Sequence, residues 1–279
     1  MQLTEHFENG TKYSCEIPAP RMQVAPGLCW GDAGVPFTPA FWRFVSITRG
    51  ATTGNHSSYR LGRSLQEEVV ACLLGGYGIR GELGVEAFRI LREQHVFDSN
   101  SVSAEFLEDL LKRAFWLGAK QVRYRFPRQK AKYIAAALAC LRCEDPPEGG
   151  RALRNWLTRI PGIGNKTASW VARNWADATD VAILDIHIHR AGVLLGLFEA
   201  NDDVSKCYSA MEASFLLFAD KIGVPPNMLD SVIWNEMRSV PTLVRQYLTK
   251  VGVKPTDRCG LPAAHQRRPT RNDDLFAIA

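Results

Sequence analysis

The chain has 279 residues, of which 46% are hydrophobic, and a formal net charge of +5, so it can bury one large core or two modest ones. No apolar run approaches the roughly 18 residues of a membrane span, and residues 1–10 lack the layout of a signal peptide. We therefore expect a soluble intracellular protein, cytoplasmic or in the nucleoid if prokaryotic, whose slight positive charge favours a polyanionic partner.

Residues 1–63 are rich in proline and glycine and show little periodicity, which predicts an irregular N-terminal extension with one short helix at 39–48. From Ser64 the pattern is helical, beginning with a capping box in which Ser64 precedes Glu67 by three residues. The apolar spacing predicts helices at 64–74, 82–95, 103–116 and 128–143.

The run from Tyr124 to Tyr133 is densely basic and aromatic. It is typical either of a surface that contacts a phosphate backbone or of an ordinary solvated helix face. Residues 144–150, EDPPEGG, are rich in helix breakers, so we expect a seam there between a leading helical part and the part that follows.

A helix ending near Arg159 leads into the sequence Pro161-Gly162-Ile163-Gly164, and a second helix is predicted at 165–175. Two glycines around one apolar residue let the backbone adopt positive φ and approach a ligand closely. The following helix presents unpaired N–H groups and a positive dipole end, which suit a phosphate.

The apolar run 181–184 stops at Asp185, which is positioned to cap a helix at 186–197. Further helices are predicted at 204–222 and 228–239, and the tail 255–279 is polar and expected to be loosely structured. The seven cysteines are scattered and include only one CxxC pair, at Cys140 and Cys143, so we expect thiols, no metal site and no cofactor.

The hairpin glycines, Lys166 and Asp185 together resemble the helix-hairpin-helix DNA glycosylases, whose bifunctional members carry a lysine nucleophile after the hairpin and an aspartate 19 residues later (185 − 166 = 19). The stretches 64–79, 123–134 and 228–237 are similar to the archaeal-type branch of 8-oxoguanine DNA glycosylases. The resemblance implies a mainly α fold with two helical lobes and the helix-hairpin-helix motif at their junction. The glycosylase core would span residues 64–254.

The resemblance also implies the chemistry of a glycosylase and abasic-site lyase. An unprotonated Lys166 amine would attack C1′ and form a Schiff base that permits β-elimination, while Asp185 would stabilise the positive charge on the sugar. Double-stranded DNA with a damaged or modified base would be the partner of a monomeric enzyme. The lesion would be 8-oxoguanine, with another modified base, including one of foreign DNA, as the alternative. A non-catalytic hairpin that uses Lys166 only as a phosphate contact is the alternative of another class.

The remaining site residues are expected to hold the DNA. The backbone contacts are assigned to Gly162, Ile163, Gly164, Thr167 and His187. An enzyme acting at C1′ must extrude the nucleotide, and Trp234 and Asp230 are the expected stacking and polar contacts of the base. An N-capped, half-buried helix explains Asp230 and Trp234 equally well. His187 and His189 are two residues apart, which is wrong for shared metal ligation on one helix.

Overall fold

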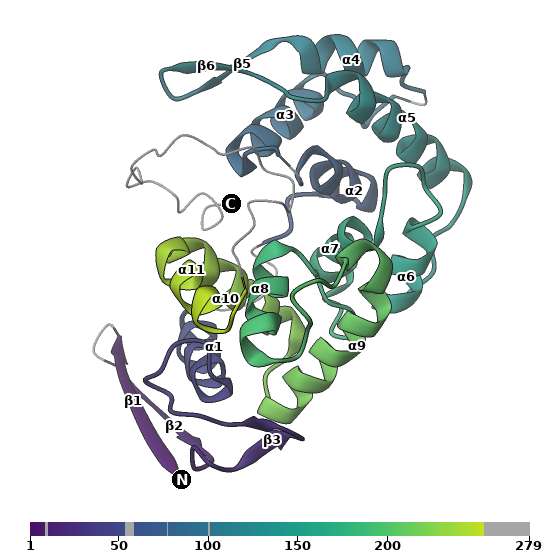
Figure 1. Cartoon of the computed structure of the whole chain (residues 1–279). Coiled ribbons are helices and arrows are strands. Elements are labelled where there is room, and N and C mark those ends of the chain that lie inside the picture. Colours follow the sequence, from purple (N-terminus) through teal and green to yellow (C-terminus); the bar gives the residue numbers. More distant parts are fainter. Residues whose placement is uncertain (9–10, 54–58, 77, 100, 254–279) are drawn as a thin grey trace. The chain divides into compact units, whose positions relative to one another are not determined.

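The computed structural model describes residues 1–8, 11–53, 59–76, 78–99 and 101–253, and these are mainly helical, as predicted (Figure 1). They divide into two compact units, each with its own apolar core. Unit 1 holds the described residues of 1–53 and 179–253, and unit 2 holds those of 59–178. The polar tail predicted at 255–279 lies outside the described residues. None of the helices in the described ranges is long and apolar enough to cross a bilayer.

The N-terminal part of unit 1 is more regular than its sequence indicated. Strand β1 (Gln2–Glu8) pairs antiparallel with β2 (Thr11–Ile17), and β3 (Gln23–Ala25) pairs with β4 (Leu28–Cys29). Along β2, Cys15 and Ile17 are buried whereas Ser14 and Glu16 are exposed, which is the two-residue period of a strand. The alternating run is short and lies in a proline-rich segment, so the sequence analysis did not detect it. The helix expected at 39–48 is present and extends further, as α1 (Pro39–Thr53).

Four more helices complete the described part of unit 1: α8 (Ile186–Leu195), α9 (Val204–Ile222), α10 (Pro226–Ser239) and α11 (Pro241–Lys250). Helix α10 packs against α1, α8 and α9 around a core that includes Trp42 and Phe215. The sequence reading predicted the first three of these helices but missed α11. Its first residue, Pro241, follows α10 after the single residue Val240 and sets a new helix direction.

Unit 2 is built on α2 (Leu65–Leu74), which packs against α3 (Gly81–Glu93), α5 (Pro127–Cys143) and α7 (Asn165–Ala176). Helix α4 (Ala104–Lys112) packs on α5, and α6 (Gly150–Leu157) packs on α7. The predicted cap is present, because the Ser64 hydroxyl accepts a hydrogen bond from the Glu67 N–H at 3.3 Å.

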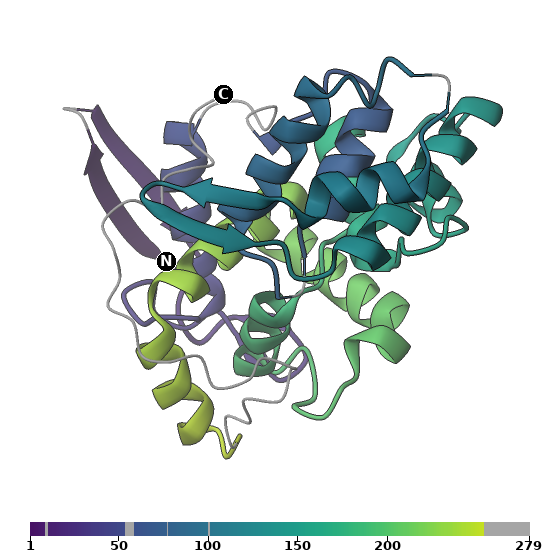
Figure 2. The ribbon, with the colours of Figure 1, turned by 90° about the horizontal axis from the view of Figure 1, so that it is seen from above.

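One predicted helix is shorter than expected. The helix expected at 103–116 ends at Lys112, and strands β5 (Ala114–Leu117) and β6 (Lys120–Arg123) follow as an antiparallel hairpin (Figure 2). Phe115 is buried and its neighbour Trp116 is exposed, which is the alternation of a strand. Gly118, with φ of +58°, makes the tight turn between the strands.

Residues 144–150, where a seam between the leading helical part and the hairpin part was expected, lie inside unit 2. Leu153 and Leu157 of α6 share one apolar core with Ile134 and Leu138 of α5, so the breaker-rich turn only joins two helices of the same unit. The chain passes from unit 2 to unit 1 after Ala178, just beyond α7.

A buried carboxylate ties the end of α7 to α2. Glu68 is fully buried, and its Oε2 accepts hydrogen bonds from the N–H groups of Leu61 and Gly62 at 2.9 and 2.7 Å. Its Oε1 accepts one from Asn174 Nδ2 at 2.7 Å. Burial and the adjacent Glu68 charge raise the pKa of the Cys72 thiol, so this cysteine stays protonated and unreactive.

Candidate active site

The hairpin between α6 and α7 is fixed to the core of unit 2 by its central residue. Ile163 is only 4% exposed, and its N–H donates to the carbonyl of Ile160 at 3.1 Å. Gly162 has φ of +86°, and a Cβ added there would lie 2.2 Å from the ring of Tyr133. The ring therefore lies directly beneath the hairpin, a role that the sequence did not reveal for Tyr133.

Gly164 differs from Gly162 in a way that corrects the expectation of positive φ at both. Its φ is −89°, which any residue can adopt, and a Cβ there would meet nothing within 4 Å. As the N-cap of α7 it offers no side-chain acceptor. The N–H groups of Asn165, Lys166 and Thr167 have no hydrogen-bond acceptor among the described residues, so the helix presents an open anion-binding terminus.

The two glycines give contrasting expected results. Gly164→Ala adds a methyl group in open space, so we expect an unchanged melting temperature. If the start of α7 binds a DNA phosphate, as the sequence predicts, the methyl group should obstruct it and weaken binding to damaged and undamaged duplexes alike by several-fold. Gly162→Ala meets the Tyr133 ring at a positive φ and should lower the melting temperature by several degrees. Calorimetry and duplex titrations at matched salt check both. Loss of affinity by Gly164→Ala for the lesion duplex alone would contradict the backbone role.

Lys166 lies on the first turn of α7, half-buried, and forms no ion pair within the described part of unit 2. Thr167 follows it and is also half-buried. Lys130, which belongs to the basic and aromatic run 124–133, has a different environment. Lys130 on α5 is half-buried, and its amine donates to the carbonyls of Leu73 and Gly75 at the end of α2, with partial burial lowering its pKa to about 8.

Asp185 is the N-cap of α8 in unit 1, as predicted. Its Oδ1 accepts hydrogen bonds from the N–H groups of His187 and Ile188 at 2.8 and 3.0 Å. The carboxylate is half-buried, and Oδ2 has no hydrogen-bond donor among the described residues. The cap therefore occupies one oxygen and leaves the other for a cationic partner.

The extended segment that carries Asp185 is held by two side chains of α9. The Oε1 atom of Glu212, a residue only 1% exposed, accepts from the Ala182 N–H at 3.0 Å. The hydroxyl of Tyr208 donates to the Ala182 carbonyl at 2.6 Å and accepts from the Leu184 N–H at 3.3 Å. Sequence reading missed both residues, because an isolated buried Glu or Tyr in a helix carries no local signal.

Asp230 also contacts this segment. It is 2% exposed, its Oδ2 accepts from the Ile183 N–H at 3.4 Å, and its Oδ1 accepts from the Ser231 hydroxyl at 3.1 Å. The two other predicted residues of unit 1 meet each other: the rings of His187 and Trp234 lie edge to face at 6.2 Å. The guanidinium of Arg238 lies 4.4 Å from the centre of the Trp234 ring.

The second histidine of the pair has a separate environment. His189 is 9% exposed and stacks on Phe198 at 6.2 Å, and burial lowers its pKa. No three His, Cys, Asp or Glu residues gather closely enough to hold a metal ion within the described ranges.

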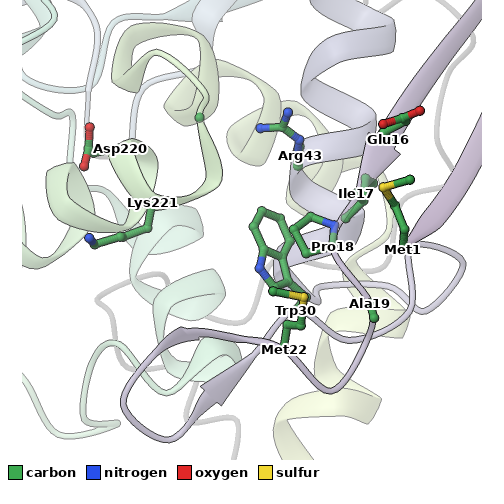
Figure 3. Close-up of a pocket in the computed structure, with 11 residues that line it drawn as sticks. Met1, Glu16, Ile17, Pro18, Ala19, Met22, Trp30, Arg43, Asp220 and Lys221 are labelled. Atoms are coloured by element: carbon green, nitrogen blue, oxygen red, sulfur yellow. The ribbon is translucent and has the colours of Figure 1, made fainter.

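A cavity of about 480 Å³ lies elsewhere in unit 1, lined by residues of the N-terminal segment and the end of α9 (Figure 3). Trp30 and Arg43 line it, and Arg43 donates to the carbonyl of Ile222. None of the predicted site residues takes part, so the cavity is not the expected base pocket.

Residues 56–224 match the family described as Ogg-HhH, 8-oxoguanine DNA glycosylase. The chain belongs to the 8-oxoguanine DNA glycosylase family. It is accordingly a DNA-binding glycosylase of base excision repair that carries a helix-hairpin-helix motif. The match covers the hairpin, Lys166 and Asp185, and it ends two residues beyond α9.

Solved structures of 8-oxoguanine DNA glycosylases are similar to this family member. The enzyme of Thermotoga maritima is 24% identical, with a TM-score of 0.55 over 72% of this chain and 95% of its own. That of Methanocaldococcus jannaschii is 25% identical, with a TM-score of 0.56 over 71% and 94%. The latter enzyme in complex with a 15mer DNA containing 8-oxoguanine gives a TM-score of 0.50 at 25% identity, over 71% and 89%. No curated protein matches the chain.

Proposed function

We propose that the protein is a bifunctional glycosylase and abasic-site lyase that acts as a monomer on duplex DNA. It removes an oxidised purine, with 8-oxoguanine as its primary substrate. The observation that carries the proposal is the half-buried Lys166, placed on the first turn of α7 behind the glycine hairpin and unpaired within the described part of unit 2. Family membership and the complex of the similar Methanocaldococcus jannaschii enzyme with 8-oxoguanine DNA support the substrate.

The reaction follows from the residue types. The Lys166 amine attacks C1′ as the glycosidic bond breaks, and the bonding electrons leave with the base, which takes up a proton. Opening of the sugar ring yields the protonated Schiff base. Loss of a proton from C2′ then forms the C2′=C3′ double bond and expels the 3′ phosphate, and water finally releases the lysine. The free Asp185 oxygen stabilises the positive charge that develops on the sugar.

The remaining site residues have two proposed roles: some bind the DNA backbone, and others recognise the damaged base. The backbone of Gly162, Ile163 and Gly164, with Thr167 beside Lys166, binds phosphate at the terminus of α7, and His187 contributes a further phosphate contact. Trp234 stacks on the extruded base. The burial of Asp230 and its bond to Ile183 favour a role in positioning the segment before Asp185 over direct contact with the base.

A panel of duplexes tests the proposal. Each duplex carries one modified base, and borohydride reduces any Schiff base to a covalent protein–DNA adduct. We expect adducts with the 8-oxoguanine duplex and none with undamaged DNA. If strong adducts formed only with another modified base, that base would be the substrate in place of 8-oxoguanine. A modified base of foreign DNA is one such alternative. Binding without excision of any base would leave a non-catalytic hairpin protein.

Trp234→Ala should weaken recognition of the damaged base without weakening binding to the DNA backbone. Stacking of one base on an aromatic ring is worth about 1–3 kcal/mol, so we expect about 5- to 150-fold weaker affinity for the lesion duplex and unchanged affinity for undamaged duplex. Titrations in a Lys166→Gln background avoid turnover. Trp234→Phe, which keeps a ring, is the matched control. Equal weakening on both duplexes by Trp234→Ala would assign this ring to the fold instead.

A further inference from the structure

The β5–β6 hairpin of unit 2 presents one exposed face. Phe115 and its partner Val122 face the core, whereas the pairs Ala114 with Arg123 and Trp116 with Gln121 lie on the opposite face. Trp116 is 61% exposed, far more than a tryptophan with only a structural role requires. We call the residues Trp116, Gln121 and Arg123 the ribbon face.

The ribbon face lies in a stretch without negative charge. Residues 110–143 contain nine Lys and Arg and no Asp or Glu. Two of these cations are used internally, because Lys112 pairs with Glu108 at 2.7 Å and Lys130 binds the end of α2. Three others, Arg113, Lys120 and Arg123, are exposed and pair with no acid in the part of the chain that the structure describes.

An exposed aromatic ring among unpaired cations is typical of a nucleic-acid surface. The shape also fits, because the major groove of duplex DNA admits a two-stranded β-ribbon. A protein partner would be expected to meet acidic as well as basic groups, whereas this surface matches the uniform negative charge of phosphates.

We propose that the ribbon face binds duplex DNA flanking the lesion. Arg123 contacts a phosphate, and Trp116 lies in the groove against the sugars and base edges. The inference rests on the protein acting on duplex DNA, but it does not depend on the lyase step or on which base is removed.

The hairpin is attached to the helix-hairpin-helix through α5. Strand β6 ends at Arg123 and leads into α5, whose Tyr133 lies beneath Gly162. Extended and helical rises over this path place the two elements within about 30 Å, or roughly nine base pairs of B-DNA. One duplex of moderate length can therefore contact both elements of unit 2.

The test uses the full chain with Trp116→Ala and Arg123→Ala combined. Both side chains are exposed, so the fold should be retained. We expect at least about fivefold weaker binding to an undamaged 25-base-pair duplex, and a salt dependence reduced by about one ion, because one stacking and one phosphate contact are lost. Two matched controls should bind like wild type. Arg89→Ala removes the same charge from a residue that pairs with Glu86 and Glu93, and Phe106→Ala removes a ring that is 42% exposed on α4.

If the double variant bound the duplex with wild-type affinity, the proposal would be overturned. The exposed Trp116 ring would then be assigned to contact with a protein partner. Equal weakening by Arg89→Ala would also overturn it, because general charge would then explain the effect. Single-turnover excision at saturating enzyme keeps the two hypotheses apart. We expect the double variant to retain the wild-type rate there, whereas an inactive wild type would contradict the proposed function and leave the binding result intact.

Discussion

Lys166→Gln will form no borohydride adduct with lesion DNA, while its affinity for the same duplex stays within about twofold of wild type. Glutamine is similar in length but has no nucleophilic amine, so no Schiff base can form. The N–H groups at the start of α7 and the hairpin that precedes it are unchanged, so the phosphate contacts persist. Adducts are measured on denaturing gels and affinity by anisotropy.

Two other lysines serve as controls for this expectation. Lys132→Gln makes the same change at an exposed position of α5 and should leave trapping intact. Lys130 is the rival nucleophile, because burial lowers the pKa of its amine to about 8. Its bonds to the carbonyls of Leu73 and Gly75 hold it at the end of α2, which argues against attack on a sugar. Adducts that persist in Lys166→Gln and vanish in Lys130→Gln would transfer the nucleophile to Lys130.

What the sequence predicted well is what local chemistry determines. Ser64 and Asp185 cap their helices through side-chain oxygens that accept N–H groups two or three residues further on. Such contacts are fixed by spacing along the chain, so a single sequence is enough to find them. The same holds for the turn at Gly162, where only glycine adopts the observed φ without strain.

What the sequence did not predict depends on residues far apart in the chain. Glu212 binds the Ala182 N–H across 30 positions, and nothing near Glu212 marks it as a support for the active-site segment. The residues of strand β5 could equally well end a helix. Their pairing with β6 and the burial of Phe115 make them a strand instead. The β1–β2 pair was missed for the same reason. The alternation of buried and exposed residues in β2 is short, and it depends on packing against α1, which is far away in the sequence.

Asp185→Asn should lower the single-turnover rate of base excision by about a hundredfold or more with little change in melting temperature. Asparagine keeps the Oδ1 that caps α8 and nearly the same shape, but it removes the negative charge that we propose stabilises the cationic sugar. Removal of one preorganised group that stabilises transition-state charge in acyl transfer costs about 10²- to 10³-fold in rate, and we expect an effect of the same order here. Rapid-quench assays with excess enzyme measure the step directly.

A matched substitution separates charge from capping. Asp203 caps α9 in the same unit by accepting from the Ser205 N–H at 2.9 Å, so Asp203→Asn makes the identical change at a cap without a proposed role in catalysis. We expect wild-type excision from it. Asp185→Ala removes both functions and should in addition lower stability by about 0.5–2 kcal/mol, the usual contribution of an N-cap. If Asp185→Asn excised the base at the wild-type rate, the cap alone would account for Asp185, and the charge on the sugar would have to be stabilised by another group.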